Sequence, residues 1–563
     1  MFGTSWRYAA ESPEVAQRAA DHNDHSVDTK ADEAGEHEAD EASEHEHEAD
    51  ERADPIAHPI DHVWAIAWRM AMALHELIEL SSVVASRVPE HATRIRVDSV
   101  DSDSRAVTNN ALFCCIRGRN TDGHSHAEAA VLAGASVLLV DHVLPVDVPQ
   151  LVVADTAAAA GALASAFAGH PSRSLRIVGV TGTNGKTTVT HLLESISIAV
   201  GHKVGVVGTI ETRFAGQSLP AMHTTPDQCT TQRLLAAMFD AGVNDVAIEV
   251  SSHALDQSRV AGTRFAVVCF TNLSRDHLDY HESMAAYGAA KARLFVAEYA
   301  PIAVINVADE FGVVLAALAA RNGLDVWTFG TPSSDVYVRS VSYNAAMTVA
   351  QLTSARTNDE FTFEIPLVGA FNVENALCAI TAHLALGTSP AAIIQGLAEM
   401  PQIPGRLERV STELDRCHVF VDYAHTPDAL TEVLGALRGI VPKGASLRAV
   451  FGCGGDRDRA KRPDMAQAVA AGADTCIITS DNPRSEEPAA IVADALADWP
   501  AGLTRPDVVL DRKQAIEAAL QRARLGDVVV IAGKGHETTQ TVGEHVSPFD
   551  DRTVARELLA GMR

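Results

Sequence analysis

The chain is 563 residues long, which is enough for three or four domains. Hydrophobic residues make up 47% of it and aromatic residues only 5%, a composition typical of a soluble α/β protein. The formal net charge is −28, and the part of the chain outside residues 21–54 still carries −15, which argues against nucleic acid as a partner because nucleic-acid binding relies on cationic side chains that neutralise phosphates.

Residues 1–60 are predicted to be a disordered acidic tail. Between positions 21 and 54, 15 Asp and Glu residues stand against Lys30 and Arg52, a local net charge of −13, and the remaining −15 belongs to the rest of the chain. Such a segment cannot bury a core. Its histidines could bind metal loosely, although a solvated tail is the favoured interpretation. They include His37, His45 and His47.

The chain shows no pattern for export or for a membrane span. Residues 1–14 lack the apolar core of a signal peptide. The stretch 63–80 is interrupted by Arg69, His75 and Glu76, so it is too short and too charged to span a bilayer. The eight cysteines include no Cys-x-x-Cys pair, which indicates reduced thiols and neither a disulfide framework nor a zinc site. We therefore expect a cytoplasmic protein.

Residues 75–173 are predicted to form a small α/β domain. Short apolar runs at 111–116, 136–140 and 150–153 have the length of buried strands. Polar segments flank the first run, with Asp-Ser-Asp-Ser-Arg at 101–105 and Arg-Gly-Arg-Asn-Thr-Asp-Gly at 117–123. These segments are candidates for ligand contacts, but they also fit common turn chemistry.

Residues 174–401 are predicted to form a central domain that begins with a phosphate-binding loop. An apolar run at 175–180 leads into Thr-Gly-Thr-Asn-Gly-Lys-Thr-Thr at 181–188, and helical spacing follows as far as Gly201. Such a loop presents backbone N–H groups and a helix dipole to an anion, Lys186 neutralises phosphates, and the Thr187 hydroxyl can ligate Mg²⁺. Val180 stands where the full P-loop pattern has glycine, and a plain glycine-rich turn is the alternative. The sequence favours a nucleoside triphosphate site.

Further strands of the central domain carry candidate metal ligands at their ends. Apolar runs at 246–250, 265–270 and 302–305 alternate with helical stretches, which predicts a doubly wound parallel sheet. Glu249 is near a strand end, where a carboxylate can hold the Mg²⁺ of a bound triphosphate, and His277 could supply a second ligand. Taken singly, each residue fits a capped turn or a satisfied polar group equally well. Pro401 and Pro404 mark the end of this domain.

Residues 402–563 are predicted to form a second nucleotide-type α/β domain. Apolar runs at 419–422, 449–451, 476–479 and 528–532 each lead into a polar or glycine-rich loop. In open α/β sheets, ligands bind at the carboxyl ends of the strands. The loop at 481–484 is Asp-Asn-Pro-Arg, in which Pro483 stiffens the turn and Arg484 offers a planar fork that matches a carboxylate.

Six motifs together resemble the Mur ligase family, the ATP-dependent amide-bond ligases of peptidoglycan precursor synthesis. They are the loop at 181–188, Glu-Val-Ser-Ser-His at 249–253, Asn-Leu-Ser-Arg-Asp-His-Leu-Asp-Tyr-His at 272–281, Asn-Val-Glu-Asn at 372–375, Pro-Gly-Arg at 404–406 and Asp-Tyr-Ala-His-Thr-Pro at 422–427. The resemblance covers roughly 92–563 and is strongest to the MurE type, which adds the third residue of the stem peptide. It implies three domains, with a central P-loop ATPase-like parallel sheet and a Rossmann-like C-terminal domain.

The resemblance also implies a mechanism and its catalytic residues. ATP would phosphorylate the D-Glu γ-carboxylate of UDP-N-acetylmuramoyl-L-alanyl-D-glutamate, and an amino group would displace the phosphate. Lys186, Glu249, His277 and Lys291 would be catalytic. Thr187, Glu249, His277 and Lys291 would hold Mg²⁺, with Lys291 as N6-carboxylysine. If it is unmodified, Lys291 is expected to be an ordinary helix-surface lysine.

Binding residues carry over position by position. The implied ATP contacts are Gly182, Thr183, Asn184, Gly185, Lys186, Thr187, Thr188, Asn375 at the adenine edge, Arg406 and Asp422. The implied UDP-substrate contacts are Ser104, Arg119, Asn120, Thr121, Thr224, Thr225, Ser251, Gln257 and Arg259. His223 stands where some family members have Asn, so the implied contact at that position stays open. The implied amino-acid contacts are Arg457, Asp481, Asn482, Pro483, Arg484, Gly533 and Glu537.

The third amino acid is expected to be meso-diaminopimelate, with lysine or ornithine as the alternative. Diaminopimelate differs from lysine by a distal carboxylate, which Arg484 would pair. Other functions remain open: a sister ligase such as folylpolyglutamate synthetase, a P-loop regulatory switch or transport ATPase, or a non-catalytic homologue. We expect a monomer whose ligands are ATP, the UDP-dipeptide and the amino acid.

Overall fold

The computed structural model describes residues 71–563, apart from 120 and 504. The predicted acidic tail at 1–60 lies outside the described residues, as does the first part of the apolar stretch at 63–80. The described chain forms three main sheets, which follow one another along the sequence. No helix in the described part of the chain is long and apolar enough to cross a membrane.

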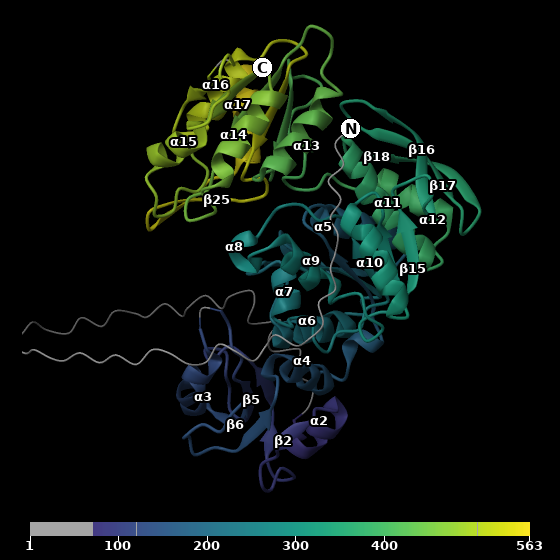
Figure 1. The fold of residues 1–563 in the computed structure, drawn as a ribbon, viewed down its shortest axis with the longest axis vertical. Helices are drawn as coiled ribbons and strands as arrows, with labels where there is room; N and C mark the ends of the chain where they lie inside the picture. The colour runs from purple at the N-terminus through teal and green to yellow at the C-terminus, as the bar shows by residue number, and fades with distance from the viewer. Residues whose placement is uncertain (1–70, 120, 504) are drawn as a thin grey trace, which may run out of the picture. The chain divides into compact units, whose positions relative to one another are not determined.

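The first sheet has five strands in the order β2-β7-β6-β5-β4. Neighbours from β4 to β7 run parallel, and the edge strand β2 runs antiparallel to β7. Helix α3 packs on one face, while α2 and α4 pack on the other (Figure 1). The elements are β1 (Met72–Ala73), α2 (Leu74–Ser81), β2 (Ala85–Arg87), β3 (Arg96–Val97), β4 (Ser99–Asp101), β5 (Ala111–Cys114), η1 (Gly123–His126), α3 (Ala127–Ala133), β6 (Ala135–Val140), β7 (Gln150–Val153) and α4 (Thr156–Phe167).

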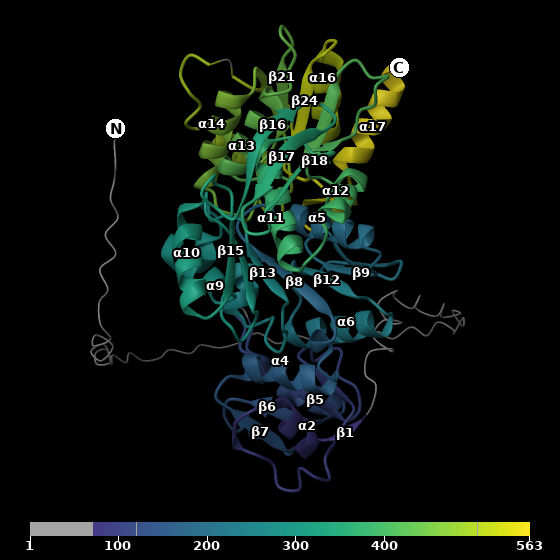
Figure 2. The same cartoon turned by 90° about the vertical axis from the view of Figure 1, so that its right-hand side faces the viewer.

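The second sheet has eleven strands in the order β11-β10-β9-β12-β8-β13-β14-β15-β16-β17-β18. Figure 2 shows β15, β13, β8, β12 and β9 across its middle. Its elements are η2 (Pro171–Arg173), β8 (Arg176–Thr181), α5 (Lys186–Ala199), β9 (Val204–Val207), β10 (Glu211–Phe214), β11 (Gln217–Pro220), α6 (Gln228–Asp240), β12 (Asp245–Glu249), α7 (Ser252–Asp256), β13 (Val267–Phe270), α8 (Leu278–His281), α9 (Met284–Ala292), β14 (Ile302–Asn306), α10 (Glu310–Arg321), β15 (Asp325–Phe329), β16 (Val336–Tyr343), β17 (Thr348–Ser354), β18 (Asp359–Ile365), α11 (Ala370–Ala385) and α12 (Pro390–Glu399).

This sheet is parallel in its middle, as predicted, but antiparallel at both edges. All neighbours from β9 to β16 run parallel, whereas β10 and β11 at one edge and β17 and β18 at the other run antiparallel. The turn between β10 and β11 consists of Ala215 and Gly216, with φ of 49° and 78°. A two-residue loop with both φ values positive closes an antiparallel hairpin, which explains the departure at that edge.

Two apolar clusters cover the faces of the central sheet. Helices α5, α11 and α12 pack on one face, and α6 and α10 pack on the other. The parallel strands are buried on both faces, so they are almost continuously apolar. This packing fixes the carboxyl ends of β8, β12 and β13 side by side, which is where the polar loops begin.

The third sheet has six strands in the order β19-β20-β24-β21-β22-β23, all parallel except the edge strand β19. Helices α13, α14 and α15 pack on one face, and α16 and α17 pack on the other; Figure 2 shows α13 and α14 on one side of the sheet and α17 on the other. The elements are β19 (Glu408–Arg409), β20 (His418–Asp422), α13 (Pro427–Arg438), β21 (Leu447–Phe451), α14 (Lys461–Gly472), β22 (Thr475–Ile478), α15 (Pro488–Leu496), β23 (Asp507–Val508), α16 (Arg512–Arg522), β24 (Val528–Ala532), β25 (Thr539–Val542), β26 (His545–Pro548) and α17 (Asp551–Met562).

Candidate active site

The phosphate loop, residues 182–185, joins β8 to the first turn of α5. Gly182 and Gly185 have φ of +154° and +86°, values that favour glycine. A Cβ at Gly182 would overlap Thr271 Oγ1, and a Cβ at Gly185 would overlap Asn375 Oδ1. The two glycines thus let the loop pack against Thr271 and Asn375 in front of the N-terminus of α5, where the helix dipole favours an anion.

Two lysines meet beneath this loop. Lys186 Nζ donates to Gly182 O at 2.9 Å and to Thr183 O at 2.8 Å, and Lys291 Nζ donates to Gly182 O at 2.8 Å. Lys291 is only 1% exposed, so the expectation of a helix-surface lysine is wrong: the face of α9 that carries it packs under the loop. Burial and the neighbouring Lys186 ammonium hold the pKa of Lys291 well below its usual range.

The predicted Mg²⁺ donors Thr187 and Glu249 line one cavity of about 260 Å³ together with the loop. Glu249 ends β12 and is buried, and its Oε1 and Oε2 accept bonds from Thr209 N and Thr209 Oγ1, both at 2.9 Å. A carboxylate has about four lone-pair sites, so two stay available after these bonds. A hard divalent cation therefore fits a hydroxyl and a carboxylate placed beside the phosphate loop.

His277 lines the same cavity, whereas Lys291 does not. The backbone of His277 is left-handed, with φ of 53°, and its side chain is half exposed. Its ring meets the ring of His253 edge-on at 4.8 Å, and its Nε2 lies 3.5 Å from Asp276 Oδ2. The structure thus brings Thr187, Glu249 and His277 to one cavity and sets Lys291 behind the loop.

The predicted nucleotide contacts outside the loop lie close to it. Arg406 Nη2 donates to Thr187 Oγ1 at 3.3 Å, and its guanidinium lies 4.8 Å from the centre of the Tyr423 ring. Asp422 is buried and accepts bonds from Leu407 N at 2.6 Å and Ala424 N at 2.7 Å. Burial raises the pKa of the Asp422 carboxyl. Asp422 therefore shapes the turn that presents Arg406.

A second cavity of about 250 Å³ opens beside Gly185 and Asn375. Asn375 Nδ2 donates to Asn372 Oδ1 at 3.2 Å, which leaves the Asn375 Oδ1 side facing Gly185. This cavity adjoins the phosphate loop and has the size of a nucleobase pocket. Its lining also includes residues to which the sequence assigns no role, namely Asn306, Asp309, Phe329, Phe371, Glu374 and Glu432.

Five predicted UDP-substrate residues form one hydrogen-bonded network. Thr225 Oγ1 donates to Glu249 O at 2.7 Å and accepts from Ser251 N at 3.1 Å. Arg259 Nη1 donates to Thr225 O at 3.0 Å, and its Nη2 donates to Gln257 Oε1 at 2.9 Å. The fifth residue, Thr224, joins the network through Thr209. The hydroxyl oxygens of these two threonines lie 3.1 Å apart, and the Thr209 hydroxyl also donates to Glu249.

The remaining predicted UDP contacts lie in the segment 75–173, which contains the first sheet. Arg119 Nη2 donates to Asp279 O at 3.1 Å, and its guanidinium lies over the Tyr280 ring, whose hydroxyl accepts from Gln257. Ser104 is half-buried in a turn and Thr121 is exposed, and neither joins this network within the described residues. Asn120 lies outside the described residues.

The predicted amino-acid residues line a larger cavity of about 680 Å³. Arg457, Asp481, Asn482, Arg484, Gly533 and Glu537 belong to its lining, whereas Pro483 does not. Pro483 instead presses its carbonyl oxygen against Gly455, where a Cβ would overlap it. The lining carries both signs of charge, as a zwitterionic ligand requires, with further contributions from Lys461 and Asp458.

A buried lysine organises the amino-acid cavity. Lys534 Nζ donates to Glu537 Oε2 at 3.0 Å, to Asn482 Oδ1 at 3.2 Å and to Thr539 O at 2.6 Å. Asn482 Nδ2 donates to the same Glu537 Oε2 at 2.7 Å. Asp481 Oδ2 is buried beside Gly533 without a hydrogen-bond partner, so it is an acceptor that a ligand ammonium would satisfy.

Arg484 is half-buried. Its φ is 52°, and Nη1 donates to Gly455 O at 2.7 Å. A Cβ on Gly454 would lie 3.2 Å from Arg484 Nη1 and 3.6 Å from Arg457 Cγ, so the two arginines flank one glycine. The free edge of the Arg484 guanidinium can still accept a carboxylate.

Sequence reasoning assigned no role to three residues that the structure places in these sites. Thr209 holds Glu249, Lys534 holds Glu537, and His425 lines both the phosphate cavity and the amino-acid cavity. His425 Nδ1 donates to Tyr423 O at 2.7 Å, and burial lowers the pKa of its imidazole, so the neutral ring keeps a lone pair on Nε2. His425 stands in a motif already recognised, whereas Thr209 has no local sequence signal.

The phosphate cavity of about 260 Å³ and the amino-acid cavity of about 680 Å³ share a wall. Asp276, His277, Tyr423, His425 and Thr426 line both of them. Phosphates held at the start of α5 and a zwitterion held near Asn482 would therefore meet across these residues. Fold and site together define the class: a P-loop nucleotide-dependent α/β enzyme with a second ligand cavity beside its phosphate loop.

Comparisons with known proteins identify the family. The Mur ligase middle domain matches residues 180–383, the Mur ligase glutamate ligase domain matches 405–535, and the Mur ligase family catalytic domain matches 96–169. A UDP-N-acetylmuramoyl-L-alanyl-D-glutamate--2,6-diaminopimelate ligase from Gloeobacter violaceus is 44% identical over 498 residues, which cover 88% of this chain and 99% of the relative. A relative of the same name from Geobacillus thermodenitrificans is 44% identical over 466 residues, 81% of this chain and 94% of the relative.

Solved structures agree. A ligase with that same name superposes with a TM-score of 0.65 at 34% identity, covering 88% of this chain and 99% of the other. MurF from Acinetobacter baumannii superposes with a TM-score of 0.59 at 17% identity, covering 87% of this chain and 99% of that one, a likeness of fold alone. The chain belongs to the Mur ligase family, and the family and fold class predicted from the motifs are confirmed.

Proposed function

We propose that this chain is an ATP-dependent acid–amino-acid ligase that adds meso-diaminopimelate to UDP-N-acetylmuramoyl-L-alanyl-D-glutamate in peptidoglycan precursor synthesis. The relatives that are 44% identical carry this activity in their names. The observation that carries the proposal is the wall of Asp276, His277 and His425 shared by the phosphate cavity and the amino-acid cavity. An activated carboxyl group formed in one cavity would face the amine held in the other.

The first step joins two anions, so it needs positive charge. A D-Glu γ-carboxylate oxygen attacks the γ-phosphorus of ATP, the bond to the ADP oxygen breaks, and an acyl phosphate forms. Lys186 and Arg406 face the phosphate cavity and neutralise charge on the transferring group. Thr187 and Glu249, with His277, would hold Mg²⁺, which when bound neutralises phosphate charge. The network of Thr225, Gln257 and Arg259 would hold the UDP-dipeptide beside them.

The second step needs a neutral amine and a proton acceptor. The amine attacks the acyl carbonyl carbon, the tetrahedral intermediate expels phosphate, and an amide remains. His425 Nε2 lies on the shared wall with its lone pair free, so it is placed to take the proton that the amine loses. Asp481 Oδ2 and Glu537 would hold the other ammonium group of the amino acid.

Lys291 is proposed to carry a carbamate. The ammonium first loses one proton, and the neutral amine then adds to CO₂ and releases a second proton, so a cation becomes a carbamate anion. Burial and the neighbouring Lys186 hold the pKa of Lys291 well below its usual range, which raises the fraction of the reactive neutral amine. Lys291 Nζ contacts Gly182 O, behind the loop that lines the cavity of the predicted Mg²⁺ donors.

The amino-acid cavity favours meso-diaminopimelate over lysine or ornithine. Arg457 and Arg484 flank Gly454 and present two cations to the cavity. The distal carboxylate of meso-diaminopimelate could pair with them, whereas lysine has no such carboxylate. A guanidinium left unpaired costs about 2 kcal/mol or more. Because Arg484 is half-buried, we expect the lower end of that cost, or roughly a 30-fold preference.

The test is a panel of amino acids offered with ATP and the UDP-dipeptide, read as amine-dependent phosphate release. The proposal expects the highest kcat/KM with meso-diaminopimelate and a loss of that preference in Arg484→Ala. Arg321→Ala, an exposed arginine at the end of α10, is the matched control. A higher kcat/KM for L-lysine, or an unchanged preference in Arg484→Ala, would refute the assignment, and amine-independent ATP hydrolysis would refute the ligase.

We further propose that the enzyme works as a monomer in the cytoplasm. ATP and UDP-linked precursors are cytoplasmic metabolites, and the eight cysteines are all free thiols, seven of them buried, as in a reducing compartment. Sedimentation of the purified full chain would test the monomer.

A further inference from the structure

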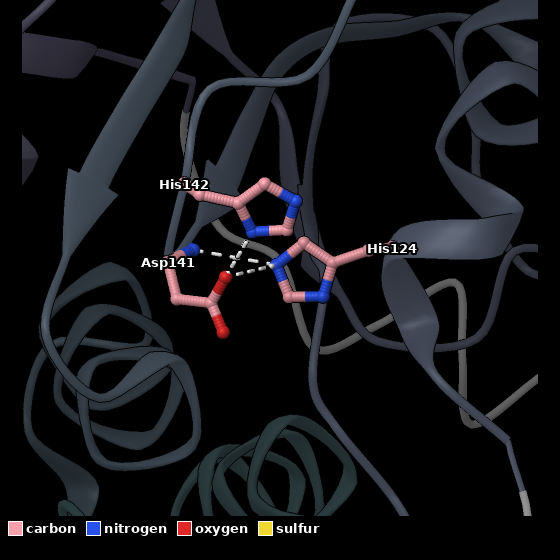
Figure 3. Close-up of side chains that lie close together, drawn as sticks. All are labelled: His124, Asp141 and His142. Carbon is pink, nitrogen blue, oxygen red and sulfur yellow. Dashed lines mark hydrogen bonds and ion pairs between the residues drawn. The ribbon is translucent and has the colours of Figure 1, made fainter. Parts of the chain in front are cut away.

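A cluster of two histidines and an aspartate lies beside the first sheet, outside the sites described above. His124 belongs to η1, and Asp141 and His142 directly follow β6. One ligand atom from each of the three side chains lies within 4.8 Å of the others, the only such group of three among the described residues. Figure 3 shows both imidazole rings turned toward the Asp141 carboxylate.

The tautomer of His124 is fixed by Asp122. Asp122 Oδ1 accepts from His124 N at 3.0 Å and lies 2.6 Å from His124 Nδ1. A carboxylate can only accept, so Nδ1 carries the hydrogen, and the lone pair of Nε2 accepts a hydrogen bond from Asp141 N at 3.3 Å, which an ion would have to replace. The His124 side chain is 5% exposed, so this ring is held in place with Nε2 directed at Asp141 (Figure 3). A histidine that donates its far N–H to a carboxylate is the usual arrangement at metal sites.

Asp141 is oriented in the same way by Arg117. Arg117 Nε donates to Asp141 Oδ2 at 2.6 Å and Arg117 Nη2 donates to Asp141 Oδ1 at 3.2 Å, so the guanidinium holds both oxygens while Oδ1 also faces the two imidazoles. His124 Nε2 lies 3.2 Å from this Oδ1, and His142 Nδ1 contacts it as well. Ligand atoms about 2.0–2.1 Å from a tetrahedral ion are about 3.3 Å apart, so the His124–Asp141 pair already has the required spacing.

We propose that His124 Nε2, Asp141 Oδ1 and His142 Nδ1 bind a divalent transition-metal ion of the Zn²⁺ class. Two imidazole nitrogens with one carboxylate favour Zn²⁺ or Co²⁺ and disfavour Mg²⁺, which prefers oxygen ligands. The site is thus distinct from the Mg²⁺ donors at the phosphate loop. His142 is 54% exposed, so its ring can turn to admit the ion, and the fourth position opens to water.

An ion at this position would tie two loops together. The segment from Arg117 to Asp122 follows β5, and it includes Arg119, which contacts Asp279 and Tyr280. Asp141 and His142 follow the neighbouring strand β6. The ion would therefore clamp the Arg119 segment to the end of β6. Without an ion, the same groups would form only a hydrogen-bonded ionic cluster.

The test measures Zn²⁺ binding to the full chain by competition with a chromophoric chelator, and Co²⁺ binding by visible absorption. Residues 1–60 contain further histidines, so variants are compared within the full chain. The full chain should contain one Zn²⁺ site whose affinity is at least tenfold higher than that of its other sites. His142→Ala and Asp141→Asn should each lose this site. Asp122→Asn, which frees the His124 tautomer, should weaken it by about 10–100-fold. His126→Ala, an exposed histidine on the same η1, is the matched control.

The Co²⁺ spectrum separates the outcomes. The proposal expects a Co²⁺ ligand-field band in the wild-type protein and in His126→Ala, and no such band in His142→Ala. Millimolar Mg²⁺ should leave the band of the wild-type protein unchanged. His142 is on the surface, so His142→Ala should fold normally by circular dichroism. Equal Zn²⁺ stoichiometry and equal Co²⁺ spectra in the wild type, His142→Ala and Asp141→Asn would overturn the proposal and leave the ionic cluster as the only role.

Discussion

The carbonyl oxygen of Gly182 accepts hydrogen bonds from the side-chain amines of both Lys186 and Lys291. Two ammonium groups so close together repel each other, and burial adds to the cost of charging Lys291. Turning Lys291 into a carbamate would replace this repulsion by attraction to Lys186. The modification would therefore relieve an unfavourable arrangement and at the same time supply a metal ligand.

Lys291→Ala should remove most of the ligase activity, by at least 100-fold, because the carbamate oxygens are lost from the metal centre. Short carboxylic acids such as acetate, at high concentration, should restore part of it by entering the space that the side chain leaves. Phosphate release is the measurement, and Lys513→Ala, an exposed lysine of α16, is the control. Near-normal turnover of Lys291→Ala would eliminate the carbamate role.

A second residue-scale prediction concerns pH. His383 is buried, and burial lowers its pKa to about 4 from an ordinary 6.5. Between pH 6.5 and 4 the unfolded chain binds a proton that the folded chain does not, so stability is lost as the pH falls through this window, by about 3 kcal/mol. His383→Gln should flatten the pH dependence of the urea midpoint there by one proton.

The flattening should be partial, because burial also lowers the pKa of His191 to about 4. His126→Gln, at an exposed position, should leave the slope as in the wild type. If His383→Gln kept the full wild-type slope between pH 6.5 and 4, the neutral state of His383 would be wrong.

At the scale of elements, helix α5 carries glycines at both ends with different tasks. Gly185 begins the helix with φ of +86° and a Cβ there would overlap Asn375 Oδ1, whereas Gly201 follows the helix with φ of +90° and open space around it. Both substitutions to alanine strain the backbone by about 1–2 kcal/mol. Only Gly185→Ala also displaces Asn375 and crowds the phosphate path.

Gly185→Ala should therefore weaken binding of a non-hydrolysable ATP analogue at least tenfold, while Gly201→Ala should lower the melting temperature and leave that binding unchanged. Calorimetric titration with the analogue and thermal unfolding measure the two effects separately. Equal losses of affinity in both variants would mean that general destabilisation, and not the shape of the loop, controls the site.

The contrast between local and long-range order explains what the sequence could predict. The phosphate loop, the strand-end position of Glu249 and the loop at 481–484 follow from contiguous patterns. The burial of Lys291 depends on which face of α9 packs under a loop 109 residues earlier. His124 and Asp141 are 17 residues apart on different elements, so no local motif joins them. Such pairings arise from tertiary packing, which periodicity does not report.

At the scale of the whole molecule, the nucleotide and the amino acid bind at different sheets and must be brought together. The phosphate loop belongs to the central sheet, and the amino-acid residues belong to the third sheet. Between α12 and β19 the chain passes through Pro401 and Pro404, and Arg406 just beyond them already reaches Thr187. Movement about this connection would carry Arg406 and the amino-acid cavity together, because both belong to the segment after it.

We predict that this connection acts as a hinge and that the enzyme closes when both substrates are bound. Closure would exclude water, which otherwise hydrolyses the acyl phosphate. Small-angle scattering should show a smaller radius of gyration with a non-hydrolysable ATP analogue plus the UDP-dipeptide than with either alone. Gly185→Ala, expected to bind the analogue at least tenfold more weakly, should stay at the larger value at an analogue concentration that saturates only the wild-type protein. An unchanged radius in the wild-type protein with both ligands at saturating concentration would show that the hinge is wrong.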